Sequence, residues 1–399
     1  YKKREKMERR GIESDDFVIK QIRGDKIIWV IFYLLALASA VMVYSASGSL
    51  AFKAGTTNIP FLIKQLKYLG IGFVALYICY KIPVGYYRLV AVPALLGSIL
   101  LSLVMLGSGG SINNAVRWMS IGSTTFQPTE ITKLAIVMYL ARMIEIGNLE
   151  SFKNYTIRIL IPVGITCVLM LVSSASTALF IALISFCMLV VGGVKWSHLW
   201  KSAGIAAIGI VLIFIVHLST GAFSRLDTAT NRIARFFQSE TTVAEMTEEE
   251  RQEEEDKTFQ ENMAKIAISS VGIKGKGPGK STQRYVLPHA YSDYIYTIII
   301  EEYGFFGGVV VLMLYMWLFY RCIVLVRGCT KVFTGLVVGG YGLVITSQAM
   351  LHILVNVGIL PVTGHTLPLI SSGGTSIVMV CCMFGIILSI SRTIDSIKA

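Results

Sequence analysis

Charged residues are scarce in this sequence. They make up 15% of the 399 residues, whereas hydrophobic residues make up 54%. A soluble globular domain carries roughly 25% charged residues, so the shortage argues against an ordinary soluble protein. The apolar residues gather in long runs, as membrane-spanning helices require.

The sequence also lacks the cysteine patterns of metal sites and disulfide-rich folds. Its seven cysteines fall in apolar runs or at their ends, and none has metal-ligand spacing. We expect small core residues without disulfides, and no protein-bound metal. A cleavable signal peptide is not expected either, because a polar segment follows the basic N-terminal residues. The first apolar run, from Ile27, is typical of a membrane span.

Basic residues exceed acidic ones, and the net charge is +12. In a soluble protein this excess would suggest nucleic-acid binding. Here the membrane gives a simpler explanation, because cytoplasmic loops of membrane proteins are rich in Lys and Arg. We therefore predict no nucleic-acid partner. A basic cytoplasmic tail over residues 1–26 is expected to lie against anionic lipid.

Hydropathy predicts ten membrane-spanning helices. Their approximate ranges are 27–46, 66–81, 89–107, 126–143, 159–173, 175–193, 203–219, 293–320, 333–355 and 369–391. Segments that would face the cytoplasm are rich in Lys and Arg, whereas the short outer loops carry Lys53, Lys64 and Arg117. The sequence therefore predicts an all-α polytopic membrane protein with both termini in the cytoplasm.

Residues 27–399 are expected to form a single transmembrane domain. Its one long extracytoplasmic loop, 220–292, joins the seventh and eighth helices and contains an acidic insert at 245–257. A solvated helix or a disordered segment is expected for the insert. Cationic residues flank the insert on both sides.

A glycine- and lysine-rich stretch, GIKGKGPGKST, follows the insert. It is not a nucleotide-binding phosphate loop, because Lys274 stands where that motif needs its first glycine. Its backbone N–H groups, with Lys276 and Lys280, can still bind an anion. A flexible loop whose lysines contact lipid phosphate is the alternative.

One carboxylate, Asp293, lies where an apolar helix is expected to begin at the outer membrane boundary. It is a candidate general base, since a partly desolvated carboxylate can accept a proton from a sugar hydroxyl. The alternative is helix capping, with Ser292 as N-cap and Asp293 in the first turn. Glu301, on the same predicted helix face, and Glu302 lie deeper, and we expect a structural ion pair or hydrogen bond for both.

Two further clusters are polar within apolar surroundings. In TFQPTEITKLA, Glu130 and Lys133 are three residues apart on a predicted helix and can form an ion pair. Packing and a direct role in binding remain open for this pair. Gln348 and Asn356 share a later span, after which prolines and glycines interrupt the helix near the outer face. Non-helical backbone at that depth must be buried in protein or line a cavity.

In their order along the chain, these stretches resemble the shape, elongation, division and sporulation (SEDS) family of peptidoglycan glycosyltransferases, which includes RodA and FtsW. The matching stretches are NNAVRWMSIG, TFQPTEITKLA, GIKGKGPGKSTQ, LPHAYSDYIYTIIIEEYGFFGG and GILPVTGHTLPLISSGGTS. The sequences GPGKSTQ and GGTS resemble the division member more than the elongation member.

Two positions depart from the family. Ser174 stands where an acid is usual, and the tyrosine of an S-Y-G-G turn is missing at 371–374.

The resemblance implies polymerisation of lipid II at the outer face of the bacterial cytoplasmic (inner) membrane. Asp293 would activate the acceptor 4-hydroxyl, which attacks the donor anomeric carbon and expels undecaprenyl pyrophosphate. Substrate binding is expected of Arg117, Lys276, Lys280, Gln283, Arg284, Ser292 and Ser371. The residues expected to shape the cavity are Glu130, Lys133, Glu301, Gln348 and Asn356.

The resemblance further implies a class B penicillin-binding transpeptidase as partner, with other membrane proteins of the division machinery. No residue cluster predicts a metal site, although Mg²⁺ or Mn²⁺ can accompany the pyrophosphate. Three other functions are open: a lipid II flippase, an elongation polymerase of the RodA type, and a scaffold that only recruits a partner. A flippase needs a polar path through both leaflets, whereas the polar residues here cluster toward the outer half, which favours the enzyme.

Overall fold

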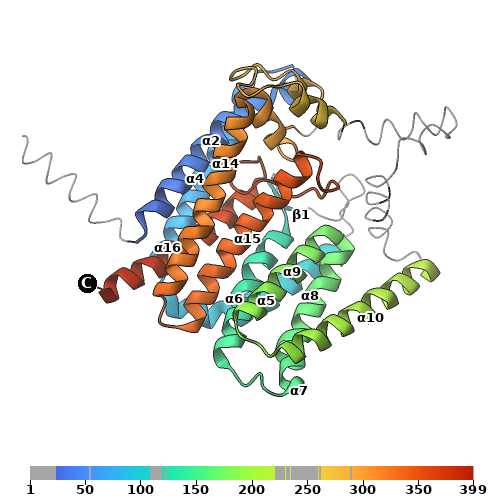
Figure 1. Cartoon of the computed structure of the whole chain (residues 1–399), viewed down its shortest axis with the longest axis vertical. Coiled ribbons are helices and arrows are strands. Elements are labelled where there is room, and N and C mark those ends of the chain that lie inside the picture. Colours follow the sequence, from blue (N-terminus) through green and yellow to red (C-terminus); the bar gives the residue numbers. More distant parts are fainter. Residues whose placement is uncertain are drawn as a thin grey trace, which may run out of the picture.

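The computed structural model describes residues 24–53, 55–107, 119–121, 124–220, 262–287 and 290–398, with the single positions 230, 234 and 259. The predicted tail up to residue 23, the acidic insert 245–257 and Arg117 lie outside these residues. The described part is almost entirely helical, as the sequence predicts (Figure 1).

The elements follow the predicted order. The helices are α2 (Lys26–Ala46), α3 (Gly48–Lys53), α4 (Ile59–Lys81), α5 (Val84–Gly107), α6 (Pro128–Ile146), α7 (Phe152–Tyr155), α8 (Ile161–Ser173), α9 (Ala175–Val191), α10 (Trp196–Thr220), α14 (Ile295–Gly328), α15 (Val332–Asn356) and α16 (Thr375–Lys398). A π-helix, η1 (Thr156–Leu160), joins α7 to α8, a 3₁₀ turn, η2 (Gln283–Tyr285), precedes α14, and residues 262–269 are also helical. The one addition to the all-α prediction within the described residues is an antiparallel hairpin of β1 (Met119–Ile121) and β2 (Thr124–Phe126).

Eight helices in the described part are long and apolar enough to cross a membrane. They are α2, α4, α5, the run from α7 through α8, α10, α14, α15 and α16. Of the two other predicted spans, α6 carries charged side chains, and α9 has only 17 residues. The chain is therefore a multi-pass membrane protein.

The spans differ in how deeply they are buried within the protein. Helices α15 and α16 are the most buried, and α10 is the least. Figure 1 shows α10 at one edge, slanting away from the other helices. Helices α4 and α16 approach so closely that a Cβ atom on Gly385 would lie 2.4 Å from the carbonyl oxygen of Leu76. Small residues permit such contacts between membrane helices.

The tenth span begins at Thr375, whereas the sequence predicted 369. Between α15 and α16 the chain is non-helical, and residues 361–374 of this stretch are called the broken segment below. Prolines remove backbone donors there, and Gly364 and Gly374 have positive φ angles of 72° and 46°. The broken segment is therefore unable to continue a helix.

Neighbouring helices satisfy the backbone of the broken segment. The Tyr315 hydroxyl of α14 donates to the carbonyl oxygen of Pro368 at 2.5 Å, and the Ser39 hydroxyl of α2 donates to that of Ile370 at 3.1 Å. Backbone polar groups in a bilayer need such partners, because no water replaces them. The broken segment is thus anchored between helices, in accord with the sequence argument.

Asp25 connects three helices at one end of the bundle. Its carboxylate caps α2 by accepting from the N–H groups of Ile27 and Ile28 at 2.9 and 3.2 Å. The same carboxylate forms an ion pair with Arg321 of α14, whose Nε lies 3.1 Å away. The Asp25 N–H donates to Ser391 Oγ of α16 at 2.7 Å. The contacts fix α2, α14 and α16 relative to one another.

At the opposite end of α14, two glycines meet where the glycine-rich loop crosses the helix. Gly304 has a φ of 69° within α14, and Gly275 has a φ of 75°. A Cβ atom on Gly304 would lie 2.2 Å from the carbonyl oxygen of Ile273. Loop N–H groups at positions 276 and 277 donate to the carbonyl oxygens of Glu301 and Glu302, both at 2.9 Å. The kink in α14 and the course of the loop therefore depend on each other.

We predict that Gly304→Ala destabilises the protein. A left-handed backbone costs a non-glycine residue about 1–2 kcal/mol, and the contact with Ile273 adds to this cost. Thermal unfolding of the detergent-purified protein measures the effect. Gly272→Ala is the matched control, because a Cβ atom there meets nothing within 4 Å. Equal stability of the two variants would contradict this account of the kink.

Candidate active site

Three consecutive carbonyl groups, at residues 291–293, precede α14, and each accepts a hydrogen bond from a distant residue. The backbone N–H of Ser372, the hydroxyl of Ser371 and the side-chain amide of Asn356 donate to them in that order, at 3.0, 2.7 and 3.0 Å. We call Asn356, Ser371 and Ser372 the carbonyl clamp. It joins the end of α15 and the broken segment to residues 291–293, the turn that contains Asp293.

The clamp explains why α14 begins later than predicted. The helix starts at Ile295, and its N-cap, Tyr294, makes no side-chain capping hydrogen bond. The alternative of helix capping, with Ser292 as N-cap and Asp293 in the first turn, is therefore wrong. Both residues lie in a turn ahead of the helix, because the clamp engages their carbonyl groups. Asp293 and Glu301 consequently do not share a helix face.

Asn356 is the most connected member of the clamp and is 1% exposed. Its Oδ1 accepts from the N–H and the hydroxyl of Thr297 at 3.2 and 2.8 Å. Its Nδ2 donates to the carbonyl oxygens of Asp293 and His352 at 3.0 and 2.9 Å. Both donors and both acceptor positions of the amide are thus used. One side chain of α15 therefore holds Asp293 and the first turn of α14 together.

Asp293 is partly buried. Burial, together with the negative charge of Asp293, raises the pKa of the Tyr291 hydroxyl above its usual value. Tyr291 therefore stays protonated at neutral pH. A half-buried carboxylate beside a neutral phenol is chemically suited to accept a proton from a sugar hydroxyl.

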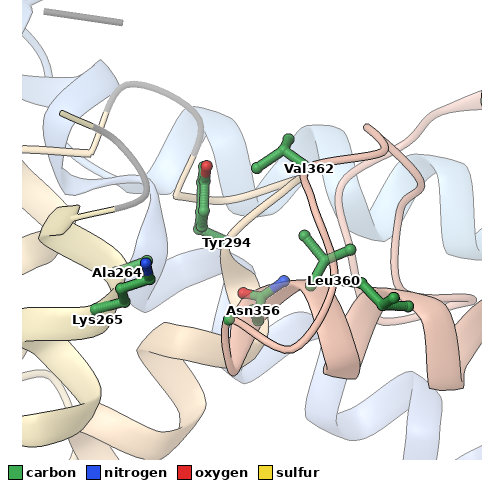
Figure 2. Close-up of a pocket in the computed structure, with 8 residues that line it drawn as sticks. Ala264, Lys265, Tyr294, Asn356, Leu360 and Val362 are labelled. Carbon is green, nitrogen blue, oxygen red and sulfur yellow. The ribbon is translucent and has the colours of Figure 1, made fainter. Parts of the chain in front are cut away.

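A small pocket borders the clamp. It is lined by Ala264, Lys265, Tyr294, Val355, Asn356, Gly358, Leu360 and Val362. Figure 2 shows Ala264 and Lys265 on one side of the pocket and Leu360 on the other, with Asn356 and Tyr294 between them. No sequence pattern points to this pocket, because its walls come from three separate parts of the chain.

The glycine-rich loop is held by Glu301, which is fully buried. Its carboxylate accepts from Lys276 Nζ at 2.6 Å, from the N–H and hydroxyl of Thr282 at 3.0 and 2.9 Å, and from the Ser281 hydroxyl. The charge of Lys276, expected to bind substrate, is thus compensated within the protein. Lys280 is exposed, and no ion pair of its side chain is found among the described residues.

Arg284 and Gln283 are anchored beside this loop. The Arg284 guanidinium donates to the hydroxyl of Tyr285 at 2.8 Å and, more weakly, to the Ser45 hydroxyl at 3.4 Å. The Ser45 hydroxyl in turn donates to Glu302 of α14. The N–H of Gln283 lies 3.4 Å from Glu301 Oε2. Arg284 therefore connects η2 to the end of α2, and Gln283 connects η2 to α14.

Glu130 and Lys133 form a buried ion pair, with Nζ and Oε1 2.7 Å apart. Lys133 Nζ also donates to Gln348 Oε1 at 2.6 Å, and Gln348 Nε2 donates to the carbonyl oxygen of Thr366 at 3.0 Å. Ser376 Oγ lies 3.3 Å from Glu130 Oε2. The network links α6 and α15 to the broken segment and to α16.

The two positions that depart from the family pattern keep defined contacts. Ser174 caps α9, since its hydroxyl accepts from the N–H of Thr177 at 3.4 Å. Ser372, in the turn that lacks the tyrosine, serves the clamp through its backbone N–H. Neither contact requires the family's usual side chain. Arg117 lies outside the described residues, so its predicted role stays a prediction.

The sequence matches the FtsW/RodA/SpoVE family, described as cell cycle proteins, over residues 25–395. The chain belongs to this family. The match covers the helices named above except for the last three residues of α16, so the predicted family resemblance is confirmed.

Relatives within the FtsW/RodA/SpoVE family carry an enzyme name. The chain is 28% identical to a probable peptidoglycan glycosyltransferase FtsW from Geobacter sp. (strain M18), over 94% of this chain and 98% of the relative. It is 30% identical to the protein of the same name from Burkholderia thailandensis, over 91% of this chain and 77% of that one. These names agree with the predicted enzyme class and with the closer likeness to the division member.

One solved structure has a similar fold. It is a chain from a study of the structural coordination of polymerization and crosslinking by a peptidoglycan synthase complex. The two chains align with a TM-score of 0.70 at 22% identity, over 93% of this chain and 98% of the other. The two chains therefore share the same overall fold.

We predict that Lys133→Met destabilises the protein strongly, because it leaves the Glu130 carboxylate buried without its cation. Removing one partner of a buried ion pair costs about 3–5 kcal/mol. The double variant Glu130→Gln/Lys133→Met should recover part of that loss, since neither charge remains. Thermal unfolding of the three purified proteins measures this. A single variant as stable as the wild type would show that the pair contributes nothing.

Proposed function

We propose that this chain polymerises lipid II into glycan strands, as a peptidoglycan glycosyltransferase acting mainly in cell division. The observation that carries the proposal is the carbonyl clamp, which fixes the half-buried Asp293 ahead of α14. The glycosyltransferase names of the relatives support the reaction class, and the FtsW name supports the division role.

The proposed topology has ten membrane spans, with α6 and α9 crossing in addition to the eight helices described above. The charges of α6 have partners within the protein, which makes a crossing feasible. Glu130 pairs with Lys133, and Glu145 pairs with Arg142 and Arg88 at 2.7 and 2.9 Å. Both termini would lie in the cytoplasm, residues 27–399 would form one domain, and the loop 220–292 would lie outside the bacterial cytoplasmic membrane.

In the proposed reaction, Asp293 takes the proton from the 4-hydroxyl of the acceptor sugar. The acceptor oxygen then attacks the anomeric carbon of the donor, from the face opposite the leaving group. A new glycosidic bond forms as the bond to the pyrophosphate oxygen breaks, with inversion at the anomeric carbon. The electron pair leaves with undecaprenyl pyrophosphate. Such a reaction needs positioning, charge neutralisation and one base.

The remaining predicted residues take separate parts in this proposal. Lys280 and Arg284 would neutralise the leaving pyrophosphate, while Lys276, whose charge is paired with Glu301, would hold the loop in place. Ser292, in the turn ahead of α14, and Ser371, in the carbonyl clamp, would act near the substrate. Mg²⁺ or Mn²⁺ would bind together with the pyrophosphate.

We also propose a partner, a class B penicillin-binding transpeptidase within the division machinery. A polymerase makes uncrosslinked strands, so a crosslinking enzyme must act on its product. The similar solved chain comes from a peptidoglycan synthase complex, which supports a shared assembly.

We predict that Asp293→Asn loses glycan synthesis by roughly 10²–10⁴-fold, the usual contribution of a positioned general base. The assay uses purified protein, lipid II and the cognate transpeptidase, and glycan strands are resolved on a gel. Glu150→Gln is the control, because that carboxylate is exposed and lies in the loop between α6 and α7. Polymerisation by Asp293→Asn at the wild-type rate would refute the assigned base. Transport of lipid II across vesicles without polymer formation would favour a flippase.

A further inference from the structure

A cation that the sequence analysis did not assign lies beside the clamp. Lys265, on the helix formed by residues 262–269, lines the pocket with Tyr294 and Asn356 (Figure 2). The charge of Lys276 is already paired with Glu301. Lys265 is exposed, and within the described part of the chain no ion pair of its ammonium group is found. Its charge is therefore available to a ligand.

The Lys265 side chain packs against the residues that follow α15. Gly358 has a φ of 82°, and a Cβ atom there would lie 3.2 Å from Lys265 Cε. The alkyl stem of the lysine thus passes over a position with no side chain. The Gly358 N–H donates to the carbonyl oxygen of Val355 at 3.0 Å, which fixes this position at the end of α15.

The rest of the pocket indicates what kind of ligand fits. Its other walls are mainly aliphatic, from Ala264, Val355, Leu360 and Val362. Asn356 uses its whole amide within the protein, so among the described lining residues Lys265 supplies the charge. Ile266, the next residue on the same helix, is 44% exposed, which favours contact with lipid. An anionic group attached to an apolar chain matches this combination, and lysine is a common phosphate ligand.

We propose that the exposed Lys265, at the edge of this small pocket, binds a phosphate group of a polyprenyl diphosphate. The inference rests on the proposed function and deepens it by assigning a subsite for the donor or the leaving group. A phospholipid headgroup presents the same phosphate chemistry, so the test must separate the two sources.

The test measures binding of radiolabelled undecaprenyl pyrophosphate to purified protein in phosphatidylcholine nanodiscs. The Asp293→Asn background is used, so that no turnover is needed for binding. Lys265→Ala should weaken binding roughly tenfold or more, as expected for one charge-assisted hydrogen bond, and Lys265→Arg should retain most of it. Lys274→Ala is the matched control, because Lys274 is exposed but does not line the pocket.

A second arm replaces part of the phosphatidylcholine with phosphatidylglycerol. Undecaprenyl pyrophosphate binding that stays sensitive to Lys265 and resists phosphatidylglycerol supports the proposal. Equal binding by Lys265→Ala and Lys274→Ala overturns it. Displacement by phosphatidylglycerol also overturns it, in favour of a headgroup site. If the wild type makes no polymer but binding still depends on Lys265, the proposed function fails while this site stands.

Discussion

The clamp on the carbonyl groups of residues 291–293 is the contact on which the rest of the site depends. It exists because the chain after α15 does not continue as a helix. In a bilayer, the polar groups of a broken helix must find protein partners. Here these groups bind the turn that contains Asp293. The interruption of the chain after α15 therefore determines where α14 begins. The hydroxyls of Tyr315 and Ser39 anchor the broken segment to α14 and α2.

Electrostatic contacts deeper in the bundle support this arrangement. The Glu130–Lys133 pair reaches the broken segment through Gln348, and the Lys276–Glu301 pair holds the glycine-rich loop against α14. The Glu130–Lys133 pair is buried, and in the second pair Glu301 is buried while Lys276 is 30% exposed. An unpaired charge on the buried groups would be costly. The two pairs stabilise the walls of the site and leave other cations of the loop for an anionic ligand.

Much of the fold follows from the sequence, because apolar runs and the distribution of basic residues are local signals. The Glu130–Lys133 pair was also predictable, since its spacing places both side chains on one helix face. The start of α14 was not, because Ser292 is a good N-cap locally and its carbonyl is bound by Ser371, 79 residues away. The pairing of Lys276 with Glu301 and the course of Lys265 over Gly358 likewise depend on long-range contacts.

The claim that Asn356 acts by positioning Asp293 is tested most directly by a double-mutant cycle on polymerisation rates. The variants are Asn356→Ala, Asp293→Asn and the double substitution, each measured with purified lipid II at a temperature where all remain folded. We predict that Asn356→Ala slows the wild type markedly but slows Asp293→Asn little, because the residue it positions is already gone. Losses that multiply independently in the double variant would contradict the account.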